Sequence, residues 1–135
     1  MELGSFITML SFPMHKILIC GDRNWTDESF IMDSLMDYFV EHRSEPCIVI
    51  HGAARGADTL GGKCARALGL AVVSYPADWT KYGRAAGPIR NRLMLDQKPN
   101  IVIAFHDNIE ESKGTKDMLA QARQAGVETR LLTHP

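Results

Sequence analysis

The chain has 135 residues, 15 Lys+Arg against 16 Asp+Glu and 45% hydrophobic residues, so it is long enough to bury a core as one globular domain. Its three cysteines, Cys20, Cys47 and Cys64, are an odd number without a C-x-x-C pair. This spacing argues against a disulfide framework or a zinc ribbon and fits a cytoplasmic location. The formal net charge of −1 argues against nucleic acid as a partner, because proteins that bind its backbone carry an excess of basic residues.

The first residues resemble neither a signal peptide nor a membrane anchor. Residues 1–13 have no basic start and no long apolar segment, and no run in the chain approaches 18 apolar residues. We expect residues 1–13 to form a mobile N-terminal extension and residues 14–135 to form a single domain with no membrane partner.

Short β-branched runs alternate with longer segments of helical periodicity from Lys16 onward. The predicted strands are residues 16–20, 47–51, 71–75, 101–105 and 128–132. Several of these runs are continuously hydrophobic, which is typical of strands that are covered on both faces. The sequence therefore predicts an α/β fold, a three-layer α/β/α Rossmann-like sandwich with a mostly parallel five-stranded sheet.

Four helices are predicted between the strands. Thr26 is the expected N-cap of the first, and the second follows Gly56. The glycine pair at residues 61–62 lies inside that second helix, so we expect the helix to pack closely on the sheet. The third helix is predicted at residues 89–97 and the last at about residues 115–125.

The segments that follow four of the strands are rich in Gly, Arg, Asp and Ser/Thr: residues 21–25, 51–58, 75–92 and 105–115. In an open parallel sheet, ligands bind beyond the carboxyl ends of the strands, so these segments are expected to meet in one site. Glycines in the second segment would let backbone N–H groups approach a phosphate. A tight turn and an ordinary helix N-cap are the competing interpretations of the glycines at residues 52, 56 and 114.

The third segment has a local excess of positive charge. Lys81, Arg84, Arg90 and Arg92 face only Asp78. Arginine forks suit phosphate or carboxylate groups, although a single arginine can equally form a solvated surface pair. We expect the dozen or so residues before the helix predicted at residues 89–97 to have little regular structure, as functional loops of this length often do.

Several standard nucleotide and metal motifs are missing. The first turn has no G-x-G-x-x-G, and no P-loop precedes a helix, which argues against dinucleotide dehydrogenases, kinases and GTPases. The histidines and carboxylates have no recognisable ligand spacing, so no metal site is predicted. His51 and His106 are expected to have hydrogen-bonding or core roles, and Cys20 to be a buried thiol.

The same segments resemble the SLOG superfamily, which unites the DNA-processing protein A (SMF) family with the LOG phosphoribohydrolases. The resemblance covers about residues 15–132 and is greatest to the branch of small YspA/YpsA-related proteins. It rests on the sequences GDRNW at residues 21–25, HGAARGAD at 51–58, YPADW at 75–79, GPIRNR at 87–92 and GT at 114–115. The resemblance implies a Rossmann-like domain that binds nucleotides or nucleotide-derived ligands, often as a homodimer or higher homo-oligomer.

The resemblance leaves catalysis undecided. The LOG pattern has a lysine where this chain has Asn91 and a glutamate where it has Met118, while Asp117 is one residue early. A thioether cannot direct a water or stabilise a sugar cation. Arg90, Asp22 and Asp58 remain weak catalytic candidates.

We therefore predict a protein that binds a nucleotide or a nucleotide-derived phosphorylated small molecule, ADP-ribose-like or a nucleoside phosphate, as a sensor or sequestering protein. No other cofactor is expected. The predicted ligand-binding residues are Gly21, Asp22, Arg23, Trp25, Gly52, Ala53, Arg55, Gly56, Asp58, Trp79, Arg84, Gly87, Arg90, Asn91, Gly114 and Thr115.

Two alternatives remain. One is a hydrolase of phosphoribohydrolase type. The other is single-stranded DNA binding of the DNA-processing protein A type, with Trp25, Trp79 and Tyr82 as stacking residues. Trp25 and Trp79 could equally be partly buried structural residues.

Overall fold

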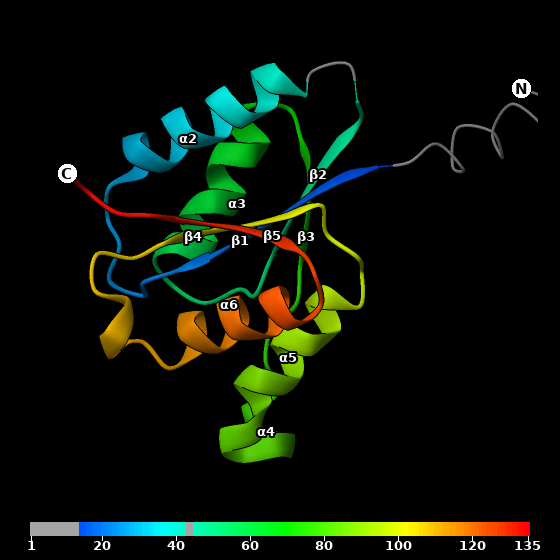
Figure 1. The fold of residues 1–135 in the computed structure, drawn as a ribbon, viewed down its shortest axis with the longest axis vertical. Coiled ribbons are helices and arrows are strands. Elements are labelled where there is room, and N and C mark those ends of the chain that lie inside the picture. The colour runs from blue at the N-terminus through cyan, green and yellow to red at the C-terminus, as the bar shows by residue number, and fades with distance from the viewer. Residues whose placement is uncertain (1–13, 43–44) are drawn as a thin grey trace, which may run out of the picture.

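The computed structural model describes residues 14–42 and 45–135, and the predicted extension at residues 1–13 lies outside them. A single parallel sheet runs through the middle of the domain, with the strand order β3-β2-β1-β4-β5 (Figure 1). Its strands are β1 (His15–Gly21), β2 (Cys47–His51), β3 (Ala71–Ser74), β4 (Ile101–Phe105) and β5 (Glu128–Leu132). The predicted five-stranded Rossmann-like sheet is confirmed, and all of its described strand pairs are parallel.

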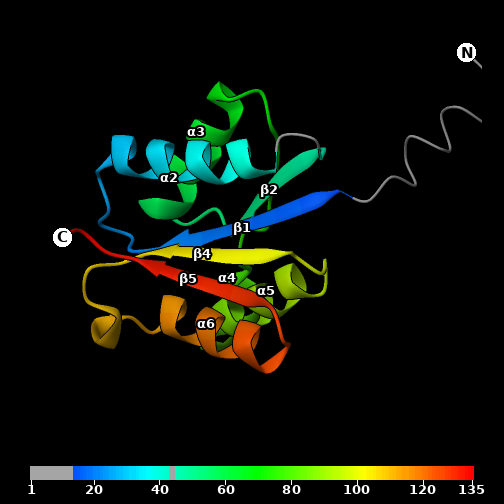
Figure 2. The same ribbon diagram turned by 45° about the horizontal axis from the view of Figure 1, so that its top comes forward.

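Helices cover both faces of the sheet, as Figure 2 shows. Helices α2 (Glu28–Glu41) and α3 (Ala57–Ala67) lie on one face, and α5 (Ala86–Leu95) and α6 (Gly114–Gln124) on the other. The short elements α4 (Trp79–Tyr82), η1 (Gly83–Ala85) and η2 (Ile109–Glu111) lie in the connections. Within residues 14–42 and 45–135, no helix has the length and apolar character needed to cross a membrane.

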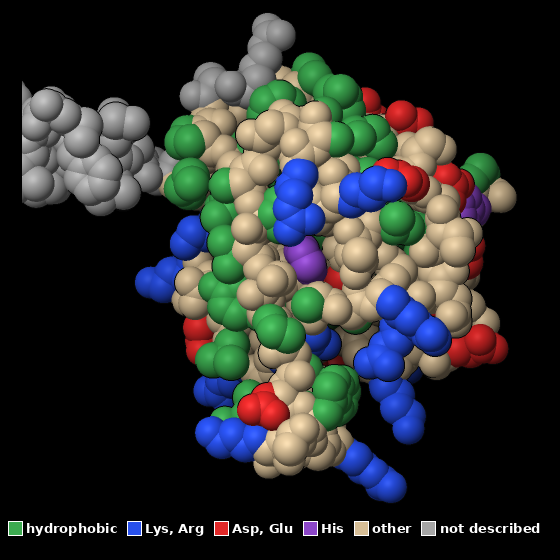
Figure 3. All heavy atoms as spheres, turned by 180° about the vertical axis from the view of Figure 1, so that it is seen from behind, with side chains coloured by type: hydrophobic (Ala, Val, Ile, Leu, Met, Phe, Trp, Pro, Cys, Tyr) green, Lys and Arg blue, Asp and Glu red, His purple; other side chains and the backbone are tan. Residues whose placement is uncertain are grey.

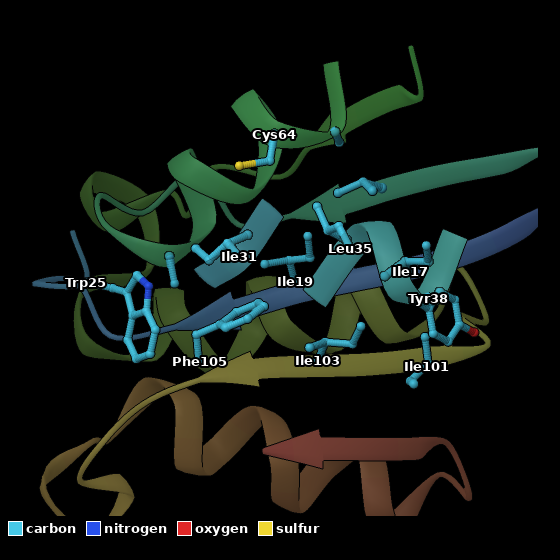
Figure 4. Packing of buried hydrophobic residues seen from close by; sticks show 13 residues of the cluster. Ile17, Ile19, Trp25, Ile31, Leu35, Tyr38, Cys64, Ile101, Ile103 and Phe105 are labelled. Atoms are coloured by element: carbon cyan, nitrogen blue, oxygen red, sulfur yellow. The ribbon is translucent and has the colours of Figure 1, made fainter. Parts of the chain in front are cut away.

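Neighbouring residues of one strand pack into different cores. Ile17 and Ile19 of β1 point toward α2 and α3, where Phe105 also packs (Figure 4). Leu18 and Cys20 of the same strand point to the opposite face, toward α5 and α6. The strand's side chains alternate between faces, so its continuous apolar run fills both cores, as the sequence predicts.

The glycine pair of α3 brings this helix close to the sheet. A Cβ atom at Gly61 would lie 2.7 Å from Ile19 Cγ2, and one at Gly62 would lie 2.7 Å from His51 Nε2. Real Cβ atoms do not approach that closely, so both positions need glycine. The predicted close packing of this helix is confirmed.

Two predicted boundaries and one predicted loop are wrong. Asp27, not Thr26, is the N-cap of α2, and its side chain accepts a hydrogen bond from Phe30 N at 3.1 Å. Helix α5 begins at Ala86 rather than at residue 89. Residues 79–82 form the one-turn helix α4 where we expected irregular structure.

Candidate functional site

An open cavity of about 550 Å³ lies beyond the carboxyl ends of β1, β2 and β3. Its lining comes from the connections after these three strands, from α4 and from α5: Arg23, Gly52, Ala53, Ala54, Arg55, Pro76, Ala77, Trp79 and Arg90. The volume is within the range of small-molecule sites. Basic side chains gather in the lower half of the face shown in Figure 3, at the end of the molecule where α4 lies.

A buried carboxylate stabilises the turn after β2 through hydrogen bonds. Asp58, only 5% exposed at the start of α3, accepts hydrogen bonds through Oδ2 from the backbone N–H groups of Gly52 at 3.0 Å and Ala54 at 3.3 Å. Between them, Ala53 has a φ of 60° and donates its N–H to His51 Nδ1 at 3.0 Å. A non-glycine residue rarely adopts this left-handed conformation, so these hydrogen bonds hold the turn in a defined shape.

The environment of Asp58 changes its acidity. Burial raises the pKa of Asp58 to about 6, although the Ala54 N–H and the positive charge of Arg90 act in the opposite direction. The carboxyl group therefore titrates close to neutral pH. A buried carboxyl group with a pKa shifted in this way stabilises the turn through its hydrogen bonds to the two backbone N–H groups.

Arg90 reaches the same turn from the other side of the sheet. Its Nη1 donates to the carbonyl oxygen of Gly52 at 2.5 Å, and its Nε donates to Asn91 Oδ1 at 2.9 Å. Asn91 is 3% exposed, and its Nδ2 donates to Asp117 Oδ2 at 2.9 Å and to the Gly114 carbonyl at 3.3 Å. The guanidinium is thus positioned by hydrogen bonds that extend into α6.

The turns after β1 and β2 touch through their backbones. The Asp22 carbonyl oxygen accepts hydrogen bonds from Ala57 N at 3.0 Å and from Trp25 N at 3.1 Å. Gly56 has a φ of 74°, and a Cβ atom there would overlap that same oxygen. Gly21 is equally confined, since a Cβ atom would overlap the carbonyl oxygen of Phe105. These glycines shape the cavity without lining it.

The outer rim of the cavity carries exposed side chains. The Arg23 guanidinium carbon lies 5.9 Å from the centroid of the Trp79 ring, and Trp79 is 51% exposed. Arg55 is exposed and donates weakly to Asn24 Oδ1 at 3.5 Å. Trp79 also packs over Gly87, where a Cβ atom would lie 3.4 Å from the indole. The rim therefore offers two cations and an aromatic face to solvent.

The structure brings many of the predicted site residues together. Those that line the cavity are Arg23, Gly52, Ala53, Arg55, Trp79 and Arg90. Those that support its wall are Gly21, Asp22, Gly56, Asp58, Gly87 and Asn91. The sequence analysis missed three lining residues, Ala54, Pro76 and Ala77, which have no reactive group. Their positions inside two predicted site segments were the only available signal.

Besides the residues that support the wall, four further predicted residues lie outside the cavity lining. Trp25 is 5% exposed, packs in the core and stacks on His134 with ring centroids 4.4 Å apart. Arg84 is exposed and outside the lining. At Gly114 and Thr115 the helix start has the ordinary form: the Ser112 hydroxyl accepts a hydrogen bond from Thr115 N at 3.0 Å. Gly114 contributes indirectly, through its contact with Asn91.

The residue at the LOG glutamate position has no access to the cavity. Met118 is 0% exposed and packs in the core beneath α6. Asp117 accepts hydrogen bonds from Asn91 and from Gln121 Nε2, the latter at 2.8 Å, so it joins α5 to α6. Both side chains therefore have structural positions.

The expected histidine and cysteine roles are also found. His51 and His106 accept hydrogen bonds through Nδ1 from nearby backbone N–H groups, each at 3.0 Å. Cys20 is a buried free thiol whose pKa is raised by burial.

Comparison with known proteins gives three findings. A model of the family described as YspA, cpYpsA-related SLOG family (YAcAr) matches residues 15–82. "Gene 61 protein" of Mycobacterium phage D29 is 35% identical over 120 residues, which are 84% of this chain and 93% of that protein. DNA processing protein A (DprA) from Streptococcus pneumoniae, known from an X-ray structure, aligns at 17% identity with a TM-score of 0.49, covering 92% of this chain and 60% of that chain.

The family match and the site coincide. Residues 15–82 include β1, β2, β3 and every residue of the cavity lining except Arg90. The match extends over half of the chain, and the similarity to the phage protein covers most of both sequences. The chain belongs to the YspA, cpYpsA-related SLOG family.

Proposed function

We propose that the protein binds a nucleotide-derived, phosphorylated small molecule in this cavity, as a sensor or sequestering protein. One observation carries the proposal: Arg23, Arg55 and Arg90 reach a single cavity from three separate segments, beside a turn of fixed backbone. A guanidinium group can donate two parallel hydrogen bonds to a phosphate group. A cavity of this size restricts the ligand to a small molecule.

The two ends of the cavity suit different parts of such a ligand. Arg90 is partly buried and already positioned, so it is suited to a phosphate that is held deep in the site. Trp79 exposes an aromatic face near Arg23 at the rim, which suits a stacked base or ribose. A nucleoside phosphate or an ADP-ribose-like molecule combines both features.

Thermal shift measurements with ADP-ribose, AMP, ADP and inorganic phosphate test the proposal. A ligand at a hundred times its Kd should stabilise the folded protein by about 2.7 kcal/mol and so raise the Tm. Arg55→Ala removes one charge-assisted contact and should weaken binding by roughly ten- to a hundredfold. Arg84→Ala is the matched control, because Arg84 is an exposed arginine outside the cavity lining.

Two results would reject this function. One is the absence of any Tm increase across the panel at millimolar concentration. The other is an equal loss of affinity in Arg55→Ala and Arg84→Ala, which would show that only the general charge of the surface matters.

A hydrolase is the second candidate, and the observation that favours it is the position of Arg90, whose partly buried guanidinium lines the cavity. A positioned cation of this kind can stabilise negative charge that develops on a reacting phosphate group. In that case a bound nucleotide would release its base or phosphate over time, and Arg90→Ala would abolish the release. Under the binding proposal, chromatography after a long incubation should recover the ligand unchanged.

Single-stranded DNA is a further outcome, and the salt dependence of binding identifies it. Trp79 and Tyr82 are both exposed on α4, and Lys81 lies between them. An oligonucleotide that stacks on these rings would bind with an affinity that falls steeply as salt increases. If the affinity for the oligonucleotide depends only weakly on salt and ADP-ribose displaces the oligonucleotide, the result would support a small-molecule ligand.

A further inference from the structure

A second cluster of reactive side chains lies at the opposite edge of the sheet, where the strands begin. His15 is the first residue of β1, His42 is the C-cap of α2, and Glu45 precedes β2. Backbone hydrogen bonds fix this corner: His15 N donates to the Pro46 carbonyl at 2.7 Å, and Glu45 N donates to the His42 carbonyl at 2.9 Å. The start of β1 and the connection between α2 and β2 therefore meet there.

The ring nitrogens and the carboxylate of this corner lie close together, and the two imidazole rings stack with their centroids 4.3 Å apart. The Nδ1 atom of His15 lies 2.7 Å from Glu45 Oε2, and the Nδ1 atom of His42 lies 3.6 Å from the same oxygen. One ligand atom from each of the three residues lies within 4.8 Å of the others. Two imidazoles and a carboxylate in this arrangement are the donor set of many zinc sites with an open coordination position.

We propose that His15, His42 and Glu45 bind a divalent transition-metal ion, with Zn²⁺ as the best match. Tetrahedral Zn²⁺ with bonds of 2.0–2.1 Å keeps its ligand atoms about 3.3 Å apart. That spacing lies between the two nitrogen–oxygen distances observed here, so binding would require the stacked imidazole side chains to rotate, which would open the shorter contact and close the longer one. The fourth position would be filled by water.

A neighbouring tyrosine would hold His15 in the required orientation. The Tyr38 hydroxyl is hydrogen-bonded to His15 Nε2, and Tyr38 is only 4% exposed. When Nε2 carries the hydrogen and donates it to the Tyr38 oxygen, the Nδ1 lone pair is free for the metal. Partners of this kind fix the tautomer and the ring of metal-binding histidines in other proteins.

The three side chains combine fixation with access. Exposure rises from 11% for His15 to 29% for His42 and 48% for Glu45. An ion can therefore enter from solvent, and two of its three protein ligands are partly buried.

Another histidine of the chain offers a matched control. His134 also contacts two carboxylates, Asp107 through Nδ1 at 2.8 Å and Asp27 through Nε2 at 2.9 Å. The two nitrogens point to opposite sides of the ring, so one ion cannot join both carboxylates to this imidazole. A histidine flanked by acids is thus present without the geometry of a shared site.

Titration of the full chain, carrying no histidine tag and first treated with a chelator, tests the proposal. Co²⁺ should give the visible absorption of a tetrahedral nitrogen–oxygen site at one equivalent, and Zn²⁺ should displace it. His42→Ala and Glu45→Gln should each weaken Zn²⁺ binding at least tenfold, and Tyr38→Phe by about tenfold. His134→Ala should leave the affinity unchanged.

The competing outcomes are distinct. No saturable binding at one equivalent, or equal affinity in the wild type and in His42→Ala, would overturn the proposal, as would an equal loss in His134→Ala. Circular dichroism controls for folding, and His42 is a suitable position because it lies at a helix end and is partly exposed. A Zn²⁺-dependent rise in Tm in the wild type that is absent from His42→Ala would support the site.

Discussion

Two glycines with nearly the same backbone conformation have very different surroundings. Gly56 has a φ of 74° and faces the Asp22 carbonyl oxygen, whereas Gly69 has a φ of 78° and nothing within 4 Å of a Cβ atom. Any L-residue is strained at both positions, but only Gly56 also excludes a methyl group by contact. A comparison of substitutions at the two positions therefore separates the cost of backbone strain from the cost of steric overlap.

Alanine at these two positions should give different losses of stability. Gly69→Ala should lower the free energy of unfolding by about 1–2 kcal/mol, which is the cost of the left-handed conformation. Gly56→Ala should lose roughly a further 1–3 kcal/mol, because two backbones must separate, and its cavity should bind ligand more weakly. Urea denaturation measures both values. Equal losses would show that the turns after β1 and β2 do not need their close approach.

The sequence predicted the positions of some site residues better than those of others. Arg23, Arg55 and Arg90 follow strands that end at one edge of the sheet, and the structure places them at one cavity. Trp25 and Trp79 both follow strands too, but the first is covered by His134 and the second is exposed. That difference depends on residues far along the chain, which local sequence does not reveal.

Helices α5 and α6 are joined by a buried amide. Asn91 contacts Arg90, Asp117 and the Gly114 carbonyl, so it connects the cavity with the start of α6. Gln121 also donates to Asp117, but it is less buried than Asn91. Asn91 therefore stabilises the packing of α5 against α6 and also positions the guanidinium group of Arg90.

Replacing this amide should affect stability and binding together. Asn91→Ala leaves buried polar partners without hydrogen bonds and should lower the free energy of unfolding by about 1–3 kcal/mol. It should also weaken ligand binding, because Arg90 Nε loses its acceptor. Gln121→Ala should have a smaller effect on stability and leave binding intact. Calorimetry of unfolding and of ligand binding compares the two variants, and equal effects would contradict the role of Asn91.

Long periodic elements were predictable from sequence, whereas short and distant features were not. The strands and main helices follow from hydrophobic periodicity, which reports burial on a face of the sheet. The one-turn helix α4 has no such period, and only its N-cap Asp78, whose side chain accepts from Lys81 N at 3.0 Å, indicates it. The corner formed by His15, His42 and Glu45 depends on how the start of β1 lies beside the end of α2, so no sequence motif predicted it.

A histidine near the end of the described chain joins distant parts of the molecule. His134 bonds to Asp27 at the start of α2 and to Asp107 after β4, and its ring stacks on Trp25. The hydrogen bond with Asp107 is the main cause of the raised pKa of His134, followed by that with Asp27. The hydrogen bond with His134 in turn lowers the pKa values of Asp27 and Asp107.

This connection should make stability depend on pH within a defined window. A raised histidine pKa gives stability that is complete below the unfolded value of 6.5 and lost as pH rises through the folded value. Lowered aspartate pKa values give stability that is complete above 3.8 and lost as pH falls through the folded values. The Tm difference between the wild type and His134→Ala should therefore be largest between these two pH values and shrink at higher pH. The same difference at pH 5 and pH 9 would contradict this mechanism.

The whole fold was the most predictable level, because five strands of similar length and four helical segments leave few ways to cover both faces of a parallel sheet. The strand order was not specified by the sequence, and the structure supplies it as β3-β2-β1-β4-β5. The expected homodimer or higher homo-oligomer stays a prediction, and sedimentation at several concentrations measures the oligomeric state.

The three buried thiols give the protein internal reporters of local opening. Cys64 of α3 lies in the core on the face covered by α2 and α3, Cys20 of β1 in the core on the face covered by α5 and α6, and Cys47 at the start of β2. A thiol reagent can react with each only after its surroundings open, so the labelling rates measure the opening of the two cores separately. A ligand in the cavity should slow the labelling of Cys20, which lies next to the turn after β1, more than the labelling of the distant Cys47.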